Sequence, residues 1–495
     1  MFTDGFRPPR GGGVTHNDDV AATAFWLPAR AIAARYPFTP GQSMFLGCQR
    51  LNGALSYVGC PIDDRHGITV AGSRSGKGTA FIIPNLYFYP GSVIANDPKA
   101  ELAMLTAGRR NAMGQSVAII DPFRESGLPP DELAAFNPMD IVDPDDESAT
   151  DEAGLLADAL IVQESGKGSH WTQSAKNLLH GAILAVAMRY PPGDPERTLS
   201  TVRELITQDA GSMTRTRELA DSIGERQGML SMMRDAGGFA EQAANGFQAK
   251  ADAERSGVLS TAQEQTAFLH SPAMRRALGA STFSIDDLKT RPEGCTVYLC
   301  LPARRMGTHA RFLRLMITVA LARMEAVKGM PRAGRPVLFM LDEFAALGHM
   351  QVIERAAGLM AGYGVKLWTV LQDLTQLKRD YKESWETFLG NAGTMQVFGN
   401  NDATTCRYVS EMCGKVETVV RSFQEITEVQ RAHDLTGISH STSLVPLIHP
   451  DEIRRMFSRA GGLQLVQFPG SYPLALERAD YFRPEHAPLF RGGFS

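Results

Sequence analysis

The chain has 495 residues, of which 43% are hydrophobic and 21% are charged, and its formal net charge is −4. This composition is typical of a folded globular protein and excludes a disordered or collagen-like chain. The length predicts roughly two to four domains. The weak net charge excludes nucleic-acid binding by the whole surface, so that any nucleic acid would have to bind a local basic patch or a pore.

The first 40 residues are predicted to form a flexible leader, because segment 7–13 is rich in Gly, Pro and Arg. Apolar segments 45–47 and 54–58 then predict a short hairpin. The longest apolar helical segment, 178–188, is far shorter than the ~20 residues that cross a membrane. We therefore expect a soluble chain, with its six cysteines as free thiols in a reducing cytosol.

Segment 71–79, Ala-Gly-Ser-Arg-Ser-Gly-Lys-Gly-Thr, lies between an apolar run at 67–70 and a helical pattern at 80–86. A strand, a glycine-rich turn, a lysine and a helix form a cradle for phosphate groups. The predicted phosphate-binding residues are Gly72, Ser73, Arg74, Ser75, Gly76, Lys77, Gly78 and Thr79. The match is imperfect, because Ala71 replaces the first glycine and Gly78 replaces the hydroxyl residue that normally helps to hold Mg²⁺. A surface loop is the alternative.

Apolar runs at 92–96 and 116–120 each lead into an aspartate, Asp97 and Asp121. Such runs are typical of parallel strands buried on both faces, whose carboxyl ends face the ligand. Between about 125 and 290 helical patterns replace strands, which predicts an inserted all-alpha domain. Strand patterns resume at 296–301, 337–341, 365–371 and 395–398, with a final pair near 463–468 and 474–477.

The predicted organisation is therefore a leader over 1–40, an interrupted nucleotide-binding domain and a helical insertion. The first part of the nucleotide-binding domain, with the phosphate loop, covers 41–138. The all-alpha domain covers 139–290. The second part, with the Asp-Glu strand and the C-terminal strands, covers 291–495. The Ser/Thr-rich tract 430–450 is expected to be a surface loop, and its widely spaced histidines do not fit a metal site.

Asp342 and Glu343 follow the apolar run 337–341. In a nucleotide site the first carboxylate holds Mg²⁺ and the second accepts a proton from the attacking water. The alternative is a helical first turn, where the helix dipole favours acidic residues. Gln372 ends the next apolar run and is expected to contact the γ-phosphate or its water. Its alternative role is that of a helix N-terminal residue without a ligand.

A series of short motifs completes the pattern. They lie at 73–78, 83–86, 90–92, 97–101, 105–108, 136–140, 171–175, 341–348, 362–364, 372–377, 398–402 and 450–454. Through them the chain resembles, over about 55–485, the type IV secretion coupling proteins of the TraG/VirD kind. Those are hexameric ATPases of bacterial conjugation and effector export, and many of them also have Ser-Gly-Lys-Gly in the loop. The resemblance implies an α/β fold: a RecA-like P-loop domain with a mainly parallel sheet, interrupted by an all-alpha domain.

The resemblance also implies ATP and Mg²⁺ as cofactors. Lys77 and its loop would bind the phosphates, Asp342 would hold Mg²⁺ (metal ligand), Glu343 would activate water and Gln372 would sense the γ-phosphate. An arginine from a neighbouring subunit would complete the site. Arg407 is the first candidate and Arg355 the second, and a solvated helix arginine is the alternative for either.

The implied partners are DNA, a relaxase or effector protein, channel components and further copies of the chain in a homo-hexamer. The implied location is the cytoplasm, at the cytoplasmic face of the inner membrane when docked. Members of the family typically begin with transmembrane helices, so membrane contact is expected here only through a partner or a missing anchor. Two alternatives stay open: a soluble hexameric DNA translocase on the same core, and a nucleotide-binding substrate receptor with little turnover.

Overall fold

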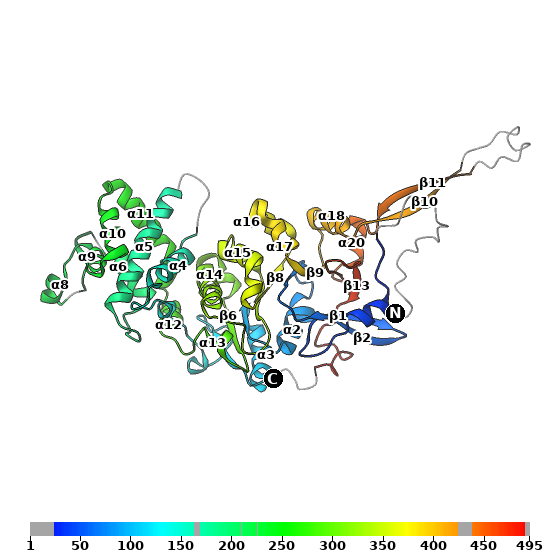
Figure 1. Ribbon diagram of the computed structural model, residues 1–495, viewed down its shortest axis with the longest axis horizontal. Coiled ribbons are helices and arrows are strands. Elements are labelled where there is room, and N and C mark those ends of the chain that lie inside the picture. The colour runs from blue at the N-terminus through cyan, green and yellow to red at the C-terminus, as the bar shows by residue number, and fades with distance from the viewer. Residues whose placement is uncertain (1–23, 163–168, 209, 225, 424–437, 491–495) are drawn as a thin grey trace, which may run out of the picture. The chain divides into compact units, whose positions relative to one another are not determined.

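The computed structural model describes residues 24–162, 169–208, 210–224, 226–423 and 438–490. The described chain divides into two compact units. Figure 1 labels the helices and strands that make up each unit. The first unit comprises residues 24–89 and 368–490, and the second comprises 90–367. The chain leaves the first unit after Tyr89 and returns to it within strand β8 (Val365–Leu371).

The first unit has the strand order β2-β1-β13-β12-β9-β3-β8. Its strands besides β8 are β1 (Ser43–Leu51), β2 (Ala54–Pro61), β3 (His66–Ala71), β9 (Ala392–Phe398), β12 (Leu463–Gln467) and β13 (Leu474–Glu477). Strand β3 pairs in parallel with β8 and β9, whereas the remaining pairs are antiparallel. Every residue of β3 is buried, as expected for a strand in the middle of a covered sheet. The predicted hairpin is confirmed as β1 and β2.

The helical segments of the first unit are α1 (Ala29–Arg35), η1 (Gly78–Ile82), α2 (Ile83–Phe88), α16 (Leu374–Tyr381), η7 (Lys382–Ser384), α17 (Trp385–Gly390), α18 (Ala403–Met412) and α20 (Pro450–Met456). Helix α1 makes the predicted flexible leader wrong for residues 24–40. Its Ile32 is buried, and the flanking Trp26 and Tyr36 are buried too. Tyr36 stacks on Phe468 with ring centroids 4.5 Å apart. Apolar burial therefore orders this segment, while residues 1–23 lie outside the described part.

The second unit contains a parallel sheet of order β7-β4-β6-β5. Its strands are β4 (Val93–Asp97), β5 (Ser116–Ile120), β6 (Cys295–Cys300) and β7 (Val337–Leu341). The helical segments outside the all-helical stretch are α3 (Glu101–Ala112), α14 (Ala303–Ala326), η5 (Phe344–Leu347), α15 (Gln351–Leu359) and η6 (Met360–Tyr363). Strands β4 and β7 are fully buried, and both lead into carboxylates at the same edge of the sheet, as predicted.

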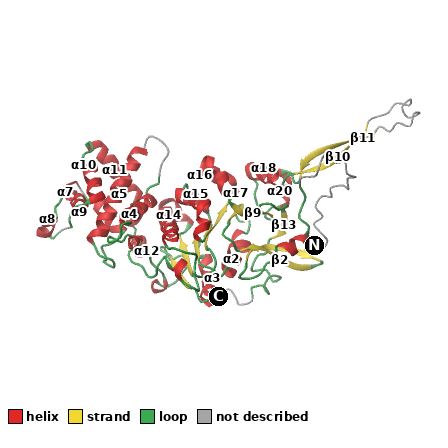
Figure 2. Cartoon of the chain, viewed as in Figure 1, coloured by secondary structure: helices red, strands yellow, loops and turns green. Residues whose placement is uncertain are grey.

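Between β5 and β6 the described residues form helices and no strand (Figure 2). The segments are η2 (Pro130–Glu132), η3 (Pro138–Ile141), α4 (Ala149–Leu160), α5 (Ser169–Arg189), α6 (Leu199–Thr207), α7 (Ala210–Met213), α8 (Arg217–Ile223), α9 (Met229–Ala236), α10 (Gly238–Gln248), α11 (Asp252–Gln265), η4 (Ala267–His270), α12 (Pro272–Leu278) and α13 (Asp287–Thr290). The helical content matches the prediction. The stretch belongs to the second unit, so its boundaries as a separate domain, at 139 and 290, remain a prediction.

Strands β10 (Lys415–Phe423) and β11 (Ile438–Pro446) form an antiparallel pair apart from the main sheet. The predicted surface loop at 430–450 is therefore wrong for 438–446, and its residues 430–437 lie outside the described part. β-Branched and apolar residues alternate with serine there, a pattern that fits a strand once a partner is available. The partner strand β10 lies outside the tract, so the composition of the tract alone could not predict the pairing.

All six cysteines are buried and free, as predicted. In the described ranges no helix is both long and apolar enough to cross a membrane. Those same ranges contain no group of three or more His, Cys, Asp or Glu side chains arranged to hold a metal ion.

Candidate functional site

The predicted phosphate loop leaves β3 at Ala71 and enters a helical segment at Gly78. The N–H of Gly72 donates to the carbonyl of Phe398 at 3.1 Å. A Cβ on Gly72 would lie 2.0 Å from the carbonyl oxygen of Gly399, so no larger residue fits. Gly76 has a φ of +95°, a conformation that other residues rarely adopt. Both glycines are therefore required by the backbone, which supports a built loop over a featureless surface turn.

The side chains of the loop differ in how far they are buried. Ser75 is buried and donates its hydroxyl to the carbonyl of Gly72 at 2.5 Å, which closes the turn. Ser73 and Arg74 are exposed, and Lys77 is half-buried at the start of the helical segment. The first N–H groups of a helix lack intrahelical acceptors and carry partial positive charge. Together with the Lys77 ammonium they make this turn suitable for an anion.

Gly78 occupies the position where phosphate loops usually have Ser or Thr. The structure shows no steric reason for a glycine there. A Cβ on Gly78 would have no heavy atom within 4 Å. The neighbouring hydroxyl does not substitute for it. Thr79 Oγ1 lies 2.6 Å from Asp480 Oδ1 and also donates to the carbonyl of Gly76 at 3.2 Å. The hydroxyl of Thr79 is thus committed to the protein.

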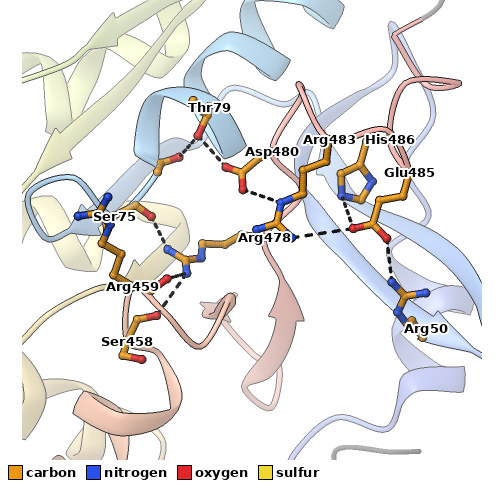
Figure 3. Close-up of polar contacts among 11 residues, drawn as sticks. Arg50, Ser75, Thr79, Ser458, Arg459, Arg478, Asp480, Arg483, Glu485 and His486 are labelled. Carbon is orange, nitrogen blue, oxygen red and sulfur yellow. Dashed lines mark hydrogen bonds and ion pairs between the residues drawn. The ribbon is translucent and has the colours of Figure 1, made fainter. Parts of the chain in front are cut away.

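A C-terminal segment that the sequence analysis missed supports the loop from below (Figure 3). Buried Arg478 donates to the carbonyl of Ser75, and its other amino nitrogen donates to the carbonyls of Ser458 and Arg459 at 3.2 and 2.6 Å. The guanidinium also lies 5.3 Å from the ring centre of Phe398. Burial lowers the pKa of Arg478. The only sequence signal was a charged residue directly after a strand, which is common on surfaces.

Gln372 is the first residue after β8, at the same edge of the sheet as the phosphate loop. Val70 of β3 is in register with Leu371 of β8, so Gln372 follows its strand where Gly72 follows β3. The main chain of Gln372 is held on both sides. Its N–H donates to Gln376 Oε1 at 3.0 Å, and its carbonyl accepts from Asn400 Nδ2 at 2.8 Å. The predicted position of Gln372 at the end of a strand is confirmed, and its contact with the γ-phosphate stays a prediction.

The predicted acidic pair lies in the second unit, directly after β7. Asp342 Oδ1 accepts the N–H of Glu343 at 2.9 Å, and the side-chain amide of Asn96 donates to the Asp342 carbonyl. Glu343 adopts a left-handed conformation, with φ 49° and ψ 43°. This costs a residue with a Cβ about 1–2 kcal/mol. Backbone strain of this kind concentrates at functional sites, so it supports a chemical role for Glu343. The alternative of a helical first turn is met only in part, because only the short η5 follows.

Asp97, at the end of β4, is the most perturbed carboxyl near this edge. Burial raises its pKa from 3.8 to about 6, and the charge of Asp342 adds to the shift. The N–H groups of Ala103 and Lys99, at 2.9 and 3.3 Å, donate to its two oxygens and oppose that shift. Asp97 therefore fixes the start of α3 and carries a proton more readily than an ordinary aspartate.

The structure thus brings the phosphate loop and Gln372 together in the first unit, and Asp342, Glu343 and Asp97 together in the second. The convergence of Lys77 with Asp342 stays a prediction. Arg407 is exposed on α18, where its Nε donates to the carbonyl of Ala403 at 3.2 Å. Arg355 is exposed on α15. The role of either arginine in a neighbouring subunit stays a prediction.

The residues present fit a magnesium nucleotide. Gly72, against which the Gly399 carbonyl packs, and Gly76, with its positive φ, keep the turn tight, so that its backbone N–H groups can face one anion. A carboxylate such as Asp342 is the hard oxygen ligand that Mg²⁺ takes. Because Gly78 supplies no hydroxyl, Mg²⁺ would have one protein oxygen fewer than usual.

Known proteins resemble this chain over most of its length. A relative named conjugal transfer protein TraG, from Escherichia coli, is 28% identical over 445 residues, which is 86% of this chain and 67% of the relative. Another TraG from the same species is 30% identical and shares 79% of this chain and 61% of its own length. Protein VirD4 of Rhizobium rhizogenes is 28% identical over 84% of this chain and 58% of its own length. The chain therefore spans about three fifths to two thirds of these relatives.

Solved structures show the same fold. The bacterial conjugative coupling protein TrwBdeltaN70 superposes with a TM-score of 0.66 at 13% identity, covering 96% of this chain and 98% of that one. TrwB in complex with the ATP analogue ADPNP gives a TM-score of 0.65 at 14% identity, covering 96% and 98%. A model of the family described as "Type IV secretory system Conjugative DNA transfer" matches residues 17–489. The chain belongs to this family and is a type IV coupling protein of the TraG/VirD4 kind.

Proposed function

We propose that the protein is an ATP-hydrolysing coupling protein. It recruits a DNA–relaxase complex or a protein effector and delivers it to a type IV secretion channel. The observation that carries this proposal is the phosphate loop, whose glycines are demanded by the backbone and whose lysine opens a helical segment. Membership of the conjugative DNA transfer family supports the cargo. Solved structures of TrwB in complex with an ATP analogue, and with ADP and Mg²⁺, support the cofactors.

In this proposal the backbone N–H groups of loop 72–79 hold the phosphates, and the Lys77 ammonium neutralises charge on the terminal ones. Glu343 accepts a proton from water as the water oxygen attacks the γ-phosphorus. The bond from that phosphorus to the bridging oxygen breaks, and ADP leaves. Gln372, next to the loop, hydrogen-bonds the γ-phosphate or the attacking water. Mg²⁺ held by Asp342 would supply charge neutralisation on the phosphates.

The site acts in a ring of subunits. The working form is a homo-hexamer, and Arg407 of a neighbouring copy contributes positive charge to the transferring phosphate, with Arg355 as the second candidate. Their exposure on α18 and α15 supports a role outside their own chain. The ring docks at the cytoplasmic face of the inner membrane through channel components.

A steady-state assay of phosphate release, with and without DNA, tests the assignment. We compare the wild type with Lys77→Ala, Glu343→Gln and a matched control, Arg30→Ala, which changes an exposed residue of helix α1 in the same unit as the loop. Losing one such group is expected to reduce turnover by about 10²–10⁴-fold. Glu343→Gln retains nucleotide binding, whereas Lys77→Ala weakens it. Equal rates in the wild type and in both site variants would reject the proposal.

Gly78 favours a second candidate function, a substrate receptor that binds nucleotide with little turnover. A missing Mg²⁺ ligand lowers the expected rate of hydrolysis without preventing binding. Tight ATP binding by the wild type without phosphate release would support this candidate. A DNA translocase unconnected to secretion is distinguished by a different experiment, because only the coupling protein should co-purify with membrane components of the secretion channel.

A further inference from the structure

Phe482 is the most exposed aromatic side chain among the large exposed hydrophobic residues of the described chain. It is 63% exposed and follows Tyr481, whose ring stands edge-on to it at 5.6 Å between centroids. Leaving a phenylalanine in water forfeits the transfer free energy that a buried ring gains. A single exposed aromatic ring far from any functional site is common and needs no explanation. The position of Phe482, however, is fixed next to the phosphate loop.

Several hydrogen bonds hold the residues around Phe482 against the loop. The N–H of Tyr481 donates to the carbonyl of Thr79 at 3.1 Å. Asp480 accepts from the Thr79 hydroxyl at 2.6 Å and from Arg483 Nε at 3.2 Å (Figure 3). The N–H of Arg483 also donates to the Asp480 carbonyl at 3.1 Å. Turn 480–483 is therefore anchored to the loop through Asp480 and Tyr481 and closed by the bonds from Arg483 to Asp480, with Phe482 inside it.

The Cα of Phe482 lies one residue beyond the contact with Thr79. At about 3.3–3.6 Å of chain per residue, this places it within about 8 Å of the Thr79 carbonyl. In a phosphate loop the lysine reaches the β- and γ-phosphates, while the N–H groups that open the helix face the α-phosphate. Here these are the N–H groups of Gly78 and Thr79. The nucleoside begins at the α-phosphate, so it must extend from the end of the loop at which turn 480–483 is anchored.

We propose that turn 480–483 forms the nucleoside subsite of the phosphate loop, with Phe482 stacking on a purine base. This inference rests on the proposed nucleotide-binding function and adds the base-binding residue to it. Asp480 is a positioning residue, because it ties the turn to Thr79. Binding of the base would cover the exposed face of the ring.

Stacking responds to the area of the ring system rather than to its hydrogen-bonding edge. The subsite should therefore prefer purines to pyrimidines and discriminate weakly between adenine and guanine. It should contribute nothing to the binding of a ligand that has phosphates but no base. These expectations separate a base contact from any effect of Phe482 on the phosphate loop itself.

Isothermal titration of the full chain with ADP, GDP, CDP and inorganic tripolyphosphate tests the proposal. Phe482→Ala is compared with Phe482→Trp, and with Phe25→Ala as the matched control, an exposed phenylalanine (46%) of the same unit that already stacks on Tyr472. Phe482→Ala is expected to weaken ADP and GDP binding by about tenfold, since a base–aromatic stack is worth that order of affinity. Phe482→Trp and the control should keep wild-type affinity, and tripolyphosphate binding should be the same in all variants.

Three results would overturn the inference. ADP affinity of Phe482→Ala within twofold of the wild type would show that the base does not rest on this ring. An equal loss of ADP and tripolyphosphate binding would show that Phe482 acts on the loop instead. Failure of the wild type to bind any of the four ligands would reject the nucleotide site itself, and so distinguishes failure of the proposed function from failure of the subsite. A thermal melt of each variant checks that all of them are folded.

Discussion

Arg478 offers a direct test of how the C-terminal segment supports the phosphate loop. The change Arg478→Met keeps a long, flexible side chain but removes every donor. Three main-chain carbonyls then lose their partner: Ser75 in the loop, and Ser458 and Arg459 after α20. Because the guanidinium is only 9% exposed, water does not readily replace it in the folded protein.

A buried carbonyl left without a donor costs about 1–3 kcal/mol, and a hydrogen bond from a charged donor contributes about 1.5–3 kcal/mol. Three carbonyls thus give a loss of several kcal/mol. Part of this loss is offset, because burying a charged guanidinium costs free energy of desolvation, which also lowers the pKa of Arg478. Burying the uncharged methionine avoids that cost. We expect the loop to be destabilised by about 3 kcal/mol, which corresponds to an opening equilibrium that is roughly 150-fold more favourable.

Hydrogen–deuterium exchange of a peptide spanning the loop measures this opening. In the wild type the N–H of Ser75 donates to the carbonyl of Gly72 at 3.2 Å and should exchange slowly. In Arg478→Met it should exchange about 100-fold faster. The control is Arg459→Met, since the Arg459 side chain is exposed and the variant keeps the main-chain carbonyl that accepts from Arg478. Exchange within about threefold of the wild type in Arg478→Met would refute this account of the loop.

Three further changes address the site itself. Gly78→Ser fills open space and replaces glycine in a helical segment, so it should raise the free energy of unfolding by about 0.5 kcal/mol. The added hydroxyl should also lower the Mg²⁺ concentration for half-maximal ATPase activity. An unchanged Mg²⁺ titration would show that the missing hydroxyl is unimportant. Glu343→Gly relieves the left-handed strain and should match or exceed wild-type stability while abolishing turnover, whereas Glu343→Gln keeps the strain; a melt in which the glycine variant is the less stable of the two would contradict this. Burial raises the pKa of Asp97 from 3.8 to about 6, so Asp97 holds its proton more tightly in the folded state than in the unfolded state. The contribution of Asp97 to the free energy of unfolding therefore falls by about 3 kcal/mol as the pH rises from about 4 to 6. Denaturation of Asp97→Asn across this range should lack that fall, and an identical pH dependence in the variant and the wild type would disprove it.

The sequence predicted the strands β3, β4 and β7 well, because each is a short apolar run. The three strands lie where these runs lie, and Asp97 and Asp342 stand at the carboxyl ends of β4 and β7 as expected. Helical periodicity likewise located the long helical stretch. Errors occurred where local composition was polar or rich in glycine and proline. Helix α1 is held by aromatic contacts with residues more than 400 positions away, and β11 by pairing with β10.

Local patterns in the sequence were enough to predict a nucleotide ligand and the residues proposed to meet it, because the glycine loop, Lys77 and the acidic pair each have a direct chemical interpretation. Only the tertiary structure revealed Arg478, Asp480 and Phe482 beside that loop. Arg478, Asp480 and Tyr481 reach the loop across about 400 positions of chain through hydrogen bonds with two backbone carbonyls and one hydroxyl. Any residue can present a backbone carbonyl, so such contacts leave no motif behind, and folding alone decides which side chain meets them.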